Sequence, residues 1–261
     1  MAAGQGHEDG RSDVSSDIDE VPLAGNAEAL EMDIRTLSSY YFISVIPNTT
    51  VFDMHRLVQH ATKKWLKANR QLERWGSQFI YNLYEVFPTG SFDTWELCRS
   101  LFPHAIAAFH TEVASQKTIL RQASLLLRSG NYASTTGAYA DAERMQRRSL
   151  DSRKQVLGKG HLDTLGSMNN LALTYSRRGK WDKAEKLQVE VMAKRKVVLG
   201  EGHPSTLTSI NNLALMHSRR GQCDKAEKLQ EEVMEKRKMV LREGHPDTLT
   251  SISNLAATYS Q

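Results

Sequence analysis

A repeat of 42 residues dominates the second half of the chain. Residues 161–202 and 203–244 are identical at 30 of 42 positions, and His161, His203 and His245 recur at the same spacing. A period of this length indicates stacked supersecondary units, because one such unit cannot bury its apolar face without a neighbour. The repeat therefore constrains the fold more strongly than any other feature of the sequence.

Each copy contains two stripes of apolar residues at helical spacing, with a glycine between them at Gly137, Gly179 or Gly221. A glycine can adopt positive φ and end a helix before a tight turn. Each copy is therefore predicted to form two antiparallel helices, which stack on their neighbours about 8–10 Å apart. The predicted fold is an all-α solenoid over 117–261, with about three repeats followed by one helix. The stripes in one copy are Leu165, Met168, Leu171, Ala172 and Tyr175, and then Ala184, Leu187, Val191, Val198 and Leu199.

The last predicted helix has no second helix of its own copy to cover it. We expect its apolar side chains to be poorly covered, which would allow two chains to associate through this helix. The side chains concerned are Leu249, Ile252, Leu255 and Tyr259.

Charge is distributed unevenly. Residues 1–32 carry one Arg against eight acidic residues, a net charge of −7, and are rich in Gly and Ser. This composition predicts a disordered acidic tail. The remaining residues carry a net charge of +11, but their Lys and Arg alternate with Glu on the predicted helix faces. That dispersal argues against nucleic acid as a partner.

Cysteine content and hydropathy indicate the compartment. Cys98 and Cys223 lie far apart in the sequence, so neither a disulfide framework nor a cysteine zinc site is predicted. No apolar run approaches the roughly 20 residues that cross a bilayer. We therefore expect a cytoplasmic protein that binds no membrane.

The segment 33–116 is organised differently. Residues 40–54 read as a β-hairpin with a turn at 47–50, and a helix with Leu57 and Trp65 on one face follows directly. Further helices are predicted over 71–87, 92–102 and 104–115, with Pro88 and Pro103 closing the first two of these. The combination of helix, hairpin and helix resembles a winged-helix module.

Several short motifs recur in register within the repeat. They are Asn-Asn-Leu-Ala at 169–172 and 211–214, Ala184-Glu185, Ala226-Glu227, Arg195, Arg237, His203-Pro204 and His245-Pro246-Asp247-Thr248. Over about 119–261 these motifs resemble the tetratricopeptide repeat of the kinesin light chain type. Departures are His217 in place of tyrosine, Cys223 in place of the aromatic residue after the turn glycine, and Leu162 in place of proline.

A second resemblance joins the two halves. Met54-His55-Arg56-Leu57-Val58-Gln59, Phe87-Pro88-Thr89-Gly90 and Leu101-Phe102-Pro103-His104-Ala105, followed by the repeats, look like the segment after the NB-ARC module of fungal STAND proteins. In that family a P-loop NTPase precedes the winged helix, and the repeats form the sensor. This chain contains no G-x-x-x-x-G-K-[ST], so the resemblance does not extend to nucleotide hydrolysis.

The sequence supports neither a catalytic site nor a metal site. Equivalent positions in successive repeats lie about 10 Å or more apart, whereas Zn–N bonds need about 2 Å. His161, His203 and His245 therefore cannot share one ion, and a structural role in the loops between helices is predicted for them. No G-x-S-x-G or H-E-x-x-H motif occurs. We predict neither enzymatic activity nor a cofactor.

The candidate site is a series of asparagines on the first helix of each copy. In tetratricopeptide domains this helix lines the inner, concave surface, and the resemblance implies that asparagines there bind the backbone of an extended peptide. The equally weighted alternative is that these amides brace neighbouring helices. Gly166, Thr208 and Thr250 occupy the positions at which related domains clamp a carboxylate, so no such clamp is predicted. The candidate residues are Asn169, Asn170, Arg177, Asn211, Asn212, Arg219 and Asn254.

The predicted function is that of a non-enzymatic scaffold that binds a peptide segment of another protein in its groove. The alternative is the sensor part of a fungal STAND NTPase that lacks its nucleotide-binding module. Either function places the binding site on the repeats.

Overall fold

A computed structural model describes residues 27–46, 52–89 and 92–259, and these divide into two compact units, one up to Gln78 and one from Phe79 on. Each unit is described by itself. Within the described residues no helix is long and apolar enough to cross a membrane.

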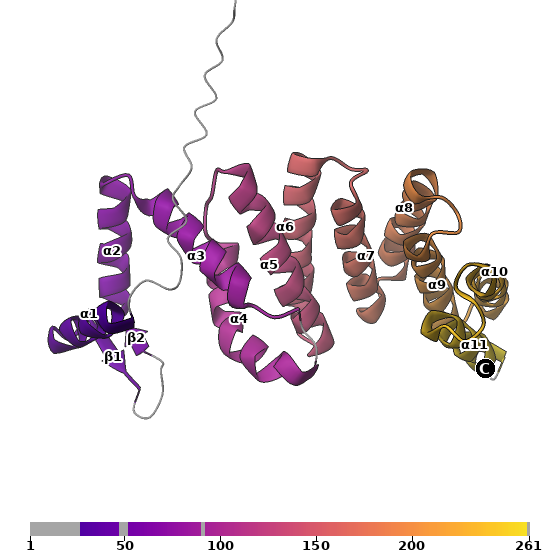
Figure 1. Cartoon of the computed structure of the whole chain (residues 1–261), viewed down its shortest axis with the longest axis horizontal. Helices are drawn as coiled ribbons and strands as arrows, with labels where there is room; N and C mark the ends of the chain where they lie inside the picture. Colours follow the sequence, from indigo (N-terminus) through magenta and orange to yellow (C-terminus); the bar gives the residue numbers. More distant parts are fainter. Residues whose placement is uncertain (1–26, 47–51, 90–91, 260–261) are drawn as a thin grey trace, which may run out of the picture. The chain divides into compact units, whose positions relative to one another are not determined.

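The first unit contains helix α1 (Ala27–Ser39), a hairpin of β1 (Ile43–Val45) and β2 (Phe52–Met54), and helix α2 (Arg56–Ala68) (Figure 1). The strands pair antiparallel, with Ile43 opposite Met54. This confirms the predicted hairpin and the helix after it, while the predicted turn at 47–50 lies outside the described residues.

The start of α1 corrects part of the predicted tail. Ala27 to Met32 belong to this helix, although 1–32 was expected to be disordered. Glu31 accepts a hydrogen bond from Arg35 at 2.7 Å, an i,i+4 pair that stabilises a helix surface. Residues 1–26 of that tail lie outside the described residues.

Helix α3 (Leu72–Val86) matches the predicted helix 71–87, but the next two predicted helices are wrong. After the short 3₁₀ turn η1 (Phe92–Thr94), a single helix α4 (Trp95–Phe109) runs through Pro103. Cys98, Ala105 and Ala108 are all fully buried on the two sides of the proline. Packing of this common face keeps the helix continuous where local propensity would end it.

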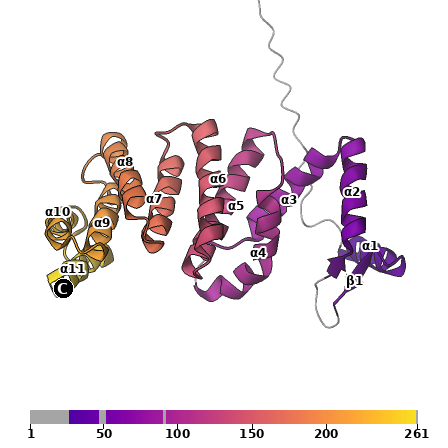
Figure 2. The same cartoon turned by 180° about the vertical axis from the view of Figure 1, so that it is seen from behind.

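The second unit is a stack of antiparallel helices in which consecutive helices pack together (Figures 1 and 2). Three complete helix pairs and one further helix agree with the predicted solenoid. The helices are α5 (Gln116–Thr135), α6 (Tyr139–Leu157), α7 (Leu162–Arg177), α8 (Trp181–Leu199), α9 (Pro204–Arg219), α10 (Cys223–Leu241) and α11 (Pro246–Tyr259).

The solenoid unit begins before residue 117, where the predicted division lies. Ile80 in α3, Phe87 directly after it and Cys98 in α4 share one buried core with Leu125 and Leu126 of α5. Arg128 of α5 also donates hydrogen bonds to two backbone carbonyls at the end of α3. The part of the predicted 33–116 module from Phe79 on therefore belongs to the same compact unit as the repeats.

Helix α11 is only partly exposed. Leu249, Ile252 and Tyr259 are 54%, 39% and 59% exposed, as predicted, but Leu255 is buried at 8%. Leu255 differs because α11 packs on α10, and this side chain lies in the covered part of the helix.

Candidate functional site

The first helices of the repeats line one side of the stack. Helix α7 contacts α5 and α9 as well as its neighbours in sequence, and α9 contacts α11. Among the described helices, the second helices α6, α8 and α10 make no comparable contact with one another. Because the first helices lie closer together, the unit curves toward them, and they form its inner face.

Most of the candidate asparagines connect one repeat to the next. The Asn212 amide donates to Asn169 Oδ1 at 2.9 Å, and the Asn254 amide donates to Asn211 Oδ1 at 3.1 Å. Gln188 on α8 also donates to Asn169 at 3.2 Å. These four asparagines therefore brace helices, which was one of the two alternatives left open by the sequence.

Asn170 is the exception in this series. Its equivalents, Asn212 and Asn254, each bond to an asparagine 43 residues earlier. At the position 43 residues before Asn170 the chain has Leu127, which offers no acceptor. Within the described residues the half-buried Asn170 amide has no hydrogen-bond partner, so both its N–H and C=O groups are available to a ligand.

Asn170 lies at a small polar cavity of about 120 Å³ between α5, α6 and α7. Arg177 is at its edge and donates to Ser134 Oγ at 2.9 Å, and Thr174 donates to the same oxygen at 3.1 Å. The guanidinium is thereby oriented, while its other N–H groups have no acceptor within the described ranges and can bind one supplied by a ligand. The residues around the cavity are Asn131, Ser134, Thr135, Gln146, Asn170, Leu173, Thr174 and Arg177.

Arg219, the equivalent of Arg177 in the next repeat, is not held in this way. Its counterpart partner would be Ser176, whose buried Oγ has no partner among the described residues. Met216 stands where the earlier repeat has Thr174, so a second donor to that hydroxyl is also missing. Arg219 is exposed, and its guanidinium makes no hydrogen bond within the described part of the chain.

The three periodic histidines cap helices. Nδ1 of His161, His203 and His245 each accepts the backbone N–H of the residue two positions later, at 3.1–3.2 Å. This satisfies an N–H group that the helix itself leaves unpaired, and it confirms the predicted structural role. In the described part of the chain no group of three His, Cys, Asp or Glu side chains could hold a metal ion.

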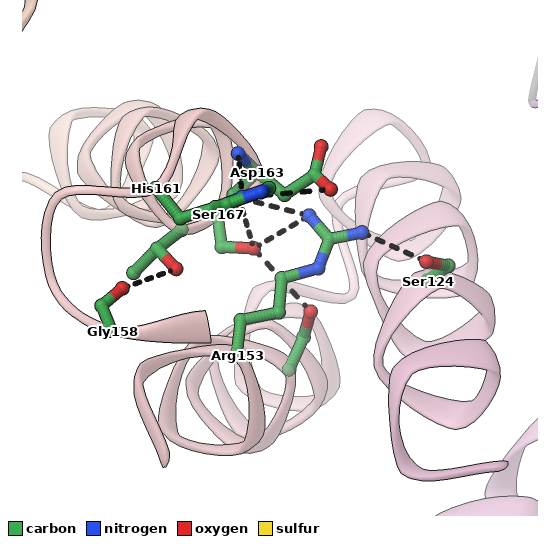
Figure 3. Close-up of polar contacts among 8 residues, drawn as sticks. Ser124, Arg153, Gly158, His161, Asp163 and Ser167 are labelled. Carbon is green, nitrogen blue, oxygen red and sulfur yellow. Dashed lines mark hydrogen bonds and ion pairs between the residues drawn. The ribbon is translucent and has the colours of Figure 1, made fainter. Parts of the chain in front are cut away.

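An arginine that is buried or half-buried joins each second helix to the next first helix, a contact that was not predicted from the sequence. Arg153 donates to the Asp163 carbonyl at 2.9 Å, to Ser167 Oγ at 3.0 Å and to Ser124 Oγ at 2.8 Å (Figure 3). Burial lowers the pKa of Arg153, Arg195 and Arg237 from the ordinary value for arginine. The contact could have been predicted from the sequence, because an arginine and a serine each recur at a spacing of 42 residues. The matching contacts are Arg195 to Ser205 and Ser209, and Arg237 to Asp247 and Ser251.

An ion cluster between repeats was also missed. Glu143 on α6 accepts hydrogen bonds from Arg147 at 2.9 Å and Lys180 at 2.8 Å, and from Arg178. Burial of this carboxylate would raise its pKa, but the hydrogen bond and charge of Lys180, with the charges of the two arginines, hold the pKa of Glu143 below its ordinary value. These charges stabilise the contact of α6 with α7 and offer no catalytic group.

The stacked helix pairs, with amides on the inner face and polar contacts between repeats, define a helical repeat protein. The chain matches the tetratricopeptide repeat family over residues 121–196, 167–239 and 205–261, which together exceed half its length. It therefore belongs to the tetratricopeptide repeat family, whose fold is that of a non-catalytic protein-interaction scaffold.

Similar structures agree on the fold. A variant of the Podosopora anserina putative kinesin light chain with nearly identical TPR-like repeats is 23% identical to this chain and has a TM-score of 0.51. The match covers 77% of this chain and 84% of that chain. BtubC from P. vanneervenii is 17% identical, with 89% and 84% covered and a TM-score of 0.54. At these identities the likeness is one of fold.

A protein related to this chain in sequence is much longer than the chain. A nucleotide-binding leucine-rich repeat (NLR)-like protein of Hyaloscypha variabilis is 41% identical over 138 residues, which are 52% of this chain and 14% of that protein. This similarity agrees with the resemblance to fungal NB-ARC proteins that carry such repeats.

Proposed function

We propose that the chain is a cytoplasmic, non-enzymatic scaffold that binds an extended polypeptide segment along the inner face of its repeats. The observation that carries this proposal is Asn170, a half-buried amide that has no partner among the described residues and lies beside an oriented arginine on that face. Unpaired polar groups in such a position favour a ligand that supplies the missing hydrogen bonds.

The candidate residues have two roles in this proposal. Asn170, Arg177 and the exposed Arg219 contact the polypeptide directly. The braced asparagines fix the spacing of the first helices, and Asn212 and Asn254 each keep one amide hydrogen for the ligand, because each amide nitrogen carries two. The braced residues are Asn169, Asn211, Asn212 and Asn254.

Selection of peptides on the purified full chain tests the proposal. Peptides from a displayed random library are expected to bind, and Asn170→Ala or Arg177→Ala should each weaken binding about tenfold by removing roughly 1.4 kcal/mol of hydrogen bonding. Lys186→Ala on the exposed surface of α8 is the matched control and should bind as the wild type does. Selected peptides that bind all three variants equally would place their site elsewhere.

The similarity to the NLR-like protein supports an alternative, in which these repeats are the sensor part of a STAND NTPase. Sequencing of full-length transcripts across the locus separates the two functions. A message that encodes a P-loop module upstream, in frame with this chain, supports the sensor function. A message that begins at Met1 supports the free-standing scaffold.

We further propose that α11 mediates association with a second copy of this chain. Leu249 and Ile252 are exposed, yet their equivalents in α9, Leu207 and Ile210, are fully buried. Asp247 is the single charged residue of α11, so two copies of this helix can pack face to face with little charge repulsion. Sedimentation velocity should show a dimer that Leu249→Lys dissociates. A monomer at all concentrations would contradict this.

A further inference from the structure

Helix α2 carries a cationic stripe, which consists of Arg56, Lys63, Lys64 and Lys67. Arg56, Lys63 and Lys67 are spaced by seven and four residues, which places them on one face of the helix, and Lys64 lies beside them. All four residues are exposed. Residues 54–72 contain five basic residues and no acidic one, a net charge of +5.

The stripe has no counter-charge within the described residues. None of its four side chains forms an ion pair there, and α2 itself contains no acidic residue. Like charges at i,i+4, such as Lys63 and Lys67, weaken a helix. An anionic chain along the stripe would therefore stabilise α2. Other helices of this chain pair an acid with a base four residues later, at Glu31 and Arg35 in α1, Glu143 and Arg147 in α6, and Glu190 and Lys194 in α8.

The acidic segment that precedes α1 matches the stripe in charge. Residues 1–26 contain six acidic residues and one arginine, a net charge of −5 against the +5 of residues 54–72. Four of these acids fall within eight positions, whose backbone spans up to about 25 Å. The 13 residues of α2 extend over about 20 Å, so this run is long enough to follow the stripe. The four acids are Asp13, Asp17, Asp19 and Glu20.

The segment is attached to the same compact unit as α2. It is joined to α1, which contacts β1, and β1 pairs with β2 shortly before α2 begins. Helix α1 is about 20 Å long, whereas 26 residues reach about 85 Å when fully extended. The segment can therefore lie on α2 of its own molecule. Covalent attachment gives it an effective concentration there on the order of millimolar, which favours it over acidic ligands in solution.

We propose that residues 1–26 of this chain lie along the cationic stripe of α2 and pair their carboxylates with Arg56, Lys63, Lys64 and Lys67. The contact lies within the first unit and does not depend on polypeptide binding by the repeats. Single exposed ion pairs are weak, so several must act together. Such a contact is sensitive to salt, because the screening length falls from about 10 Å at 0.1 M to about 3 Å at 1 M ionic strength.

Acetylation of lysines in the full chain, measured by mass spectrometry, tests this contact. A nearby carboxylate favours the charged ammonium form over the amine that reacts. Removal of the four clustered acids should therefore accelerate acetylation of Lys63, Lys64 and Lys67 about threefold or more. About 1 M salt should accelerate these lysines in the wild type to a similar extent. Lys186 on the exposed surface of α8 is the internal reference and should keep its rate. The variant is Asp13→Asn/Asp17→Asn/Asp19→Asn/Glu20→Gln, which changes no described residue.

The control variant loses the same charge in the second unit. It should leave the rates of the three α2 lysines as in the wild type, and far-UV circular dichroism checks that both variants keep their helices. Equal rates in the wild type and the segment variant, or equal acceleration in the control, would overturn the inference. Protection that appears only at high protein concentration would also overturn it, because the segment of a second copy would then lie on α2. The control is Glu96→Gln/Glu112→Gln/Asp224→Asn/Glu235→Gln, at four exposed positions.

Discussion

The residue that follows each second helix has the same unusual backbone conformation in all three repeats. Gly158 and Gly200 have φ of 86° and 88°, with ψ of 167° and 161°. Arg242 occupies the third position at φ 74° and ψ 164°. This region is accessible essentially to glycine alone, and a residue with a Cβ is strained there by about 1–3 kcal/mol. Packing of the repeats imposes this conformation, and at Arg242 it lowers the free energy of unfolding.

Arg242→Gly is therefore expected to stabilise the protein. We predict an increase of about 1–2 kcal/mol in the free energy of unfolding, measured by urea denaturation, because glycine relieves the strain at this φ and ψ. The reciprocal change Gly200→Arg should lower the same free energy by a similar amount. Equal stability of Arg242→Gly and wild type would show that contacts of the arginine side chain offset the strain.

The Glu143 cluster predicts a dependence on pH. The pKa of Glu143 is lowered in the folded chain, so its contribution to stability is present above the unfolded pKa, near 4.5, and is lost as pH falls through the folded value. Glu143→Gln should cost about 1–2 kcal/mol at pH 7. This difference from wild type should shrink in urea titrations as the pH falls below 4.5.

The control for this effect is Glu96→Gln. Glu96 lies 3.7 Å from Arg99 in an exposed pair, which contributes little to stability. The Glu96→Gln variant should have the same free energy of unfolding as the wild type at pH 3 and at pH 7. A cost of Glu143→Gln that is the same at pH 3 and pH 7 would assign it to packing instead of charge.

The sequence predicted the location of the candidate site better than its hydrogen bonds. The period of 42 residues places the asparagines on the first helices, and family resemblance places those helices on the inner face. The observed bonds, however, join residues 43 apart, such as Asn212 and Asn169. Whether an amide meets its counterpart depends on the stagger between adjacent helices, which the period does not contain. Asn170, whose side-chain amide has no partner among the described residues, could therefore be recognised only in the structure.

At the scale of elements, local signals and packing disagree at Pro103. A proline lacks the N–H that a helix interior uses, and it disfavours helical backbone in the residue before it. These rules predict two helices, yet α4 is continuous because Cys98, Ala105 and Ala108 are buried on both sides of the proline. The repeats show no such conflict, since glycine turns, helix caps and apolar stripes all agree there, and those helices were predicted correctly.

Pro103→Ala should stabilise α4. Pro103 is exposed, so alanine leaves no cavity, and it restores an N–H that can bond within the helix. We predict an increase of about 1–3 kcal/mol in the free energy of unfolding by urea, followed by far-UV circular dichroism. Pro88→Ala, in the loop after α3, is the control and should give no increase, because that proline only restricts the unfolded chain. A loss of stability in Pro103→Ala would mean that α4 requires a bend at this position.

At the scale of the whole molecule, the stability of a repeat protein is close to a sum over helix pairs and their interfaces. Helix α11 shows one interface that is not formed in this structure. Leu249 and Ile252 are exposed, but their counterparts in α7 and α9 are fully buried against the second helix of the same repeat. The sequence of this chain therefore shows which kind of helix could bury Leu249 and Ile252, because α8 and α10 bury the equivalent side chains in the two preceding repeats.

A protein extended after Gln261 by a copy of residues 178–199 tests this conclusion, because that segment continues the 42-residue register and contains α8. The added helix should cover Leu249, Ile252 and Tyr259. Full burial of one such side chain contributes about 1.5–3 kcal/mol, and part of this offsets the ordering of the added residues. We expect a net gain of about 2–4 kcal/mol in the free energy of unfolding by urea. The proposed dimer should also dissociate, since both events use the same face of α11. An extension with aspartate at the counterparts of Leu187 and Val191 should produce neither effect. If that control stabilises the protein equally, the gain comes from added length and not from cover of α11.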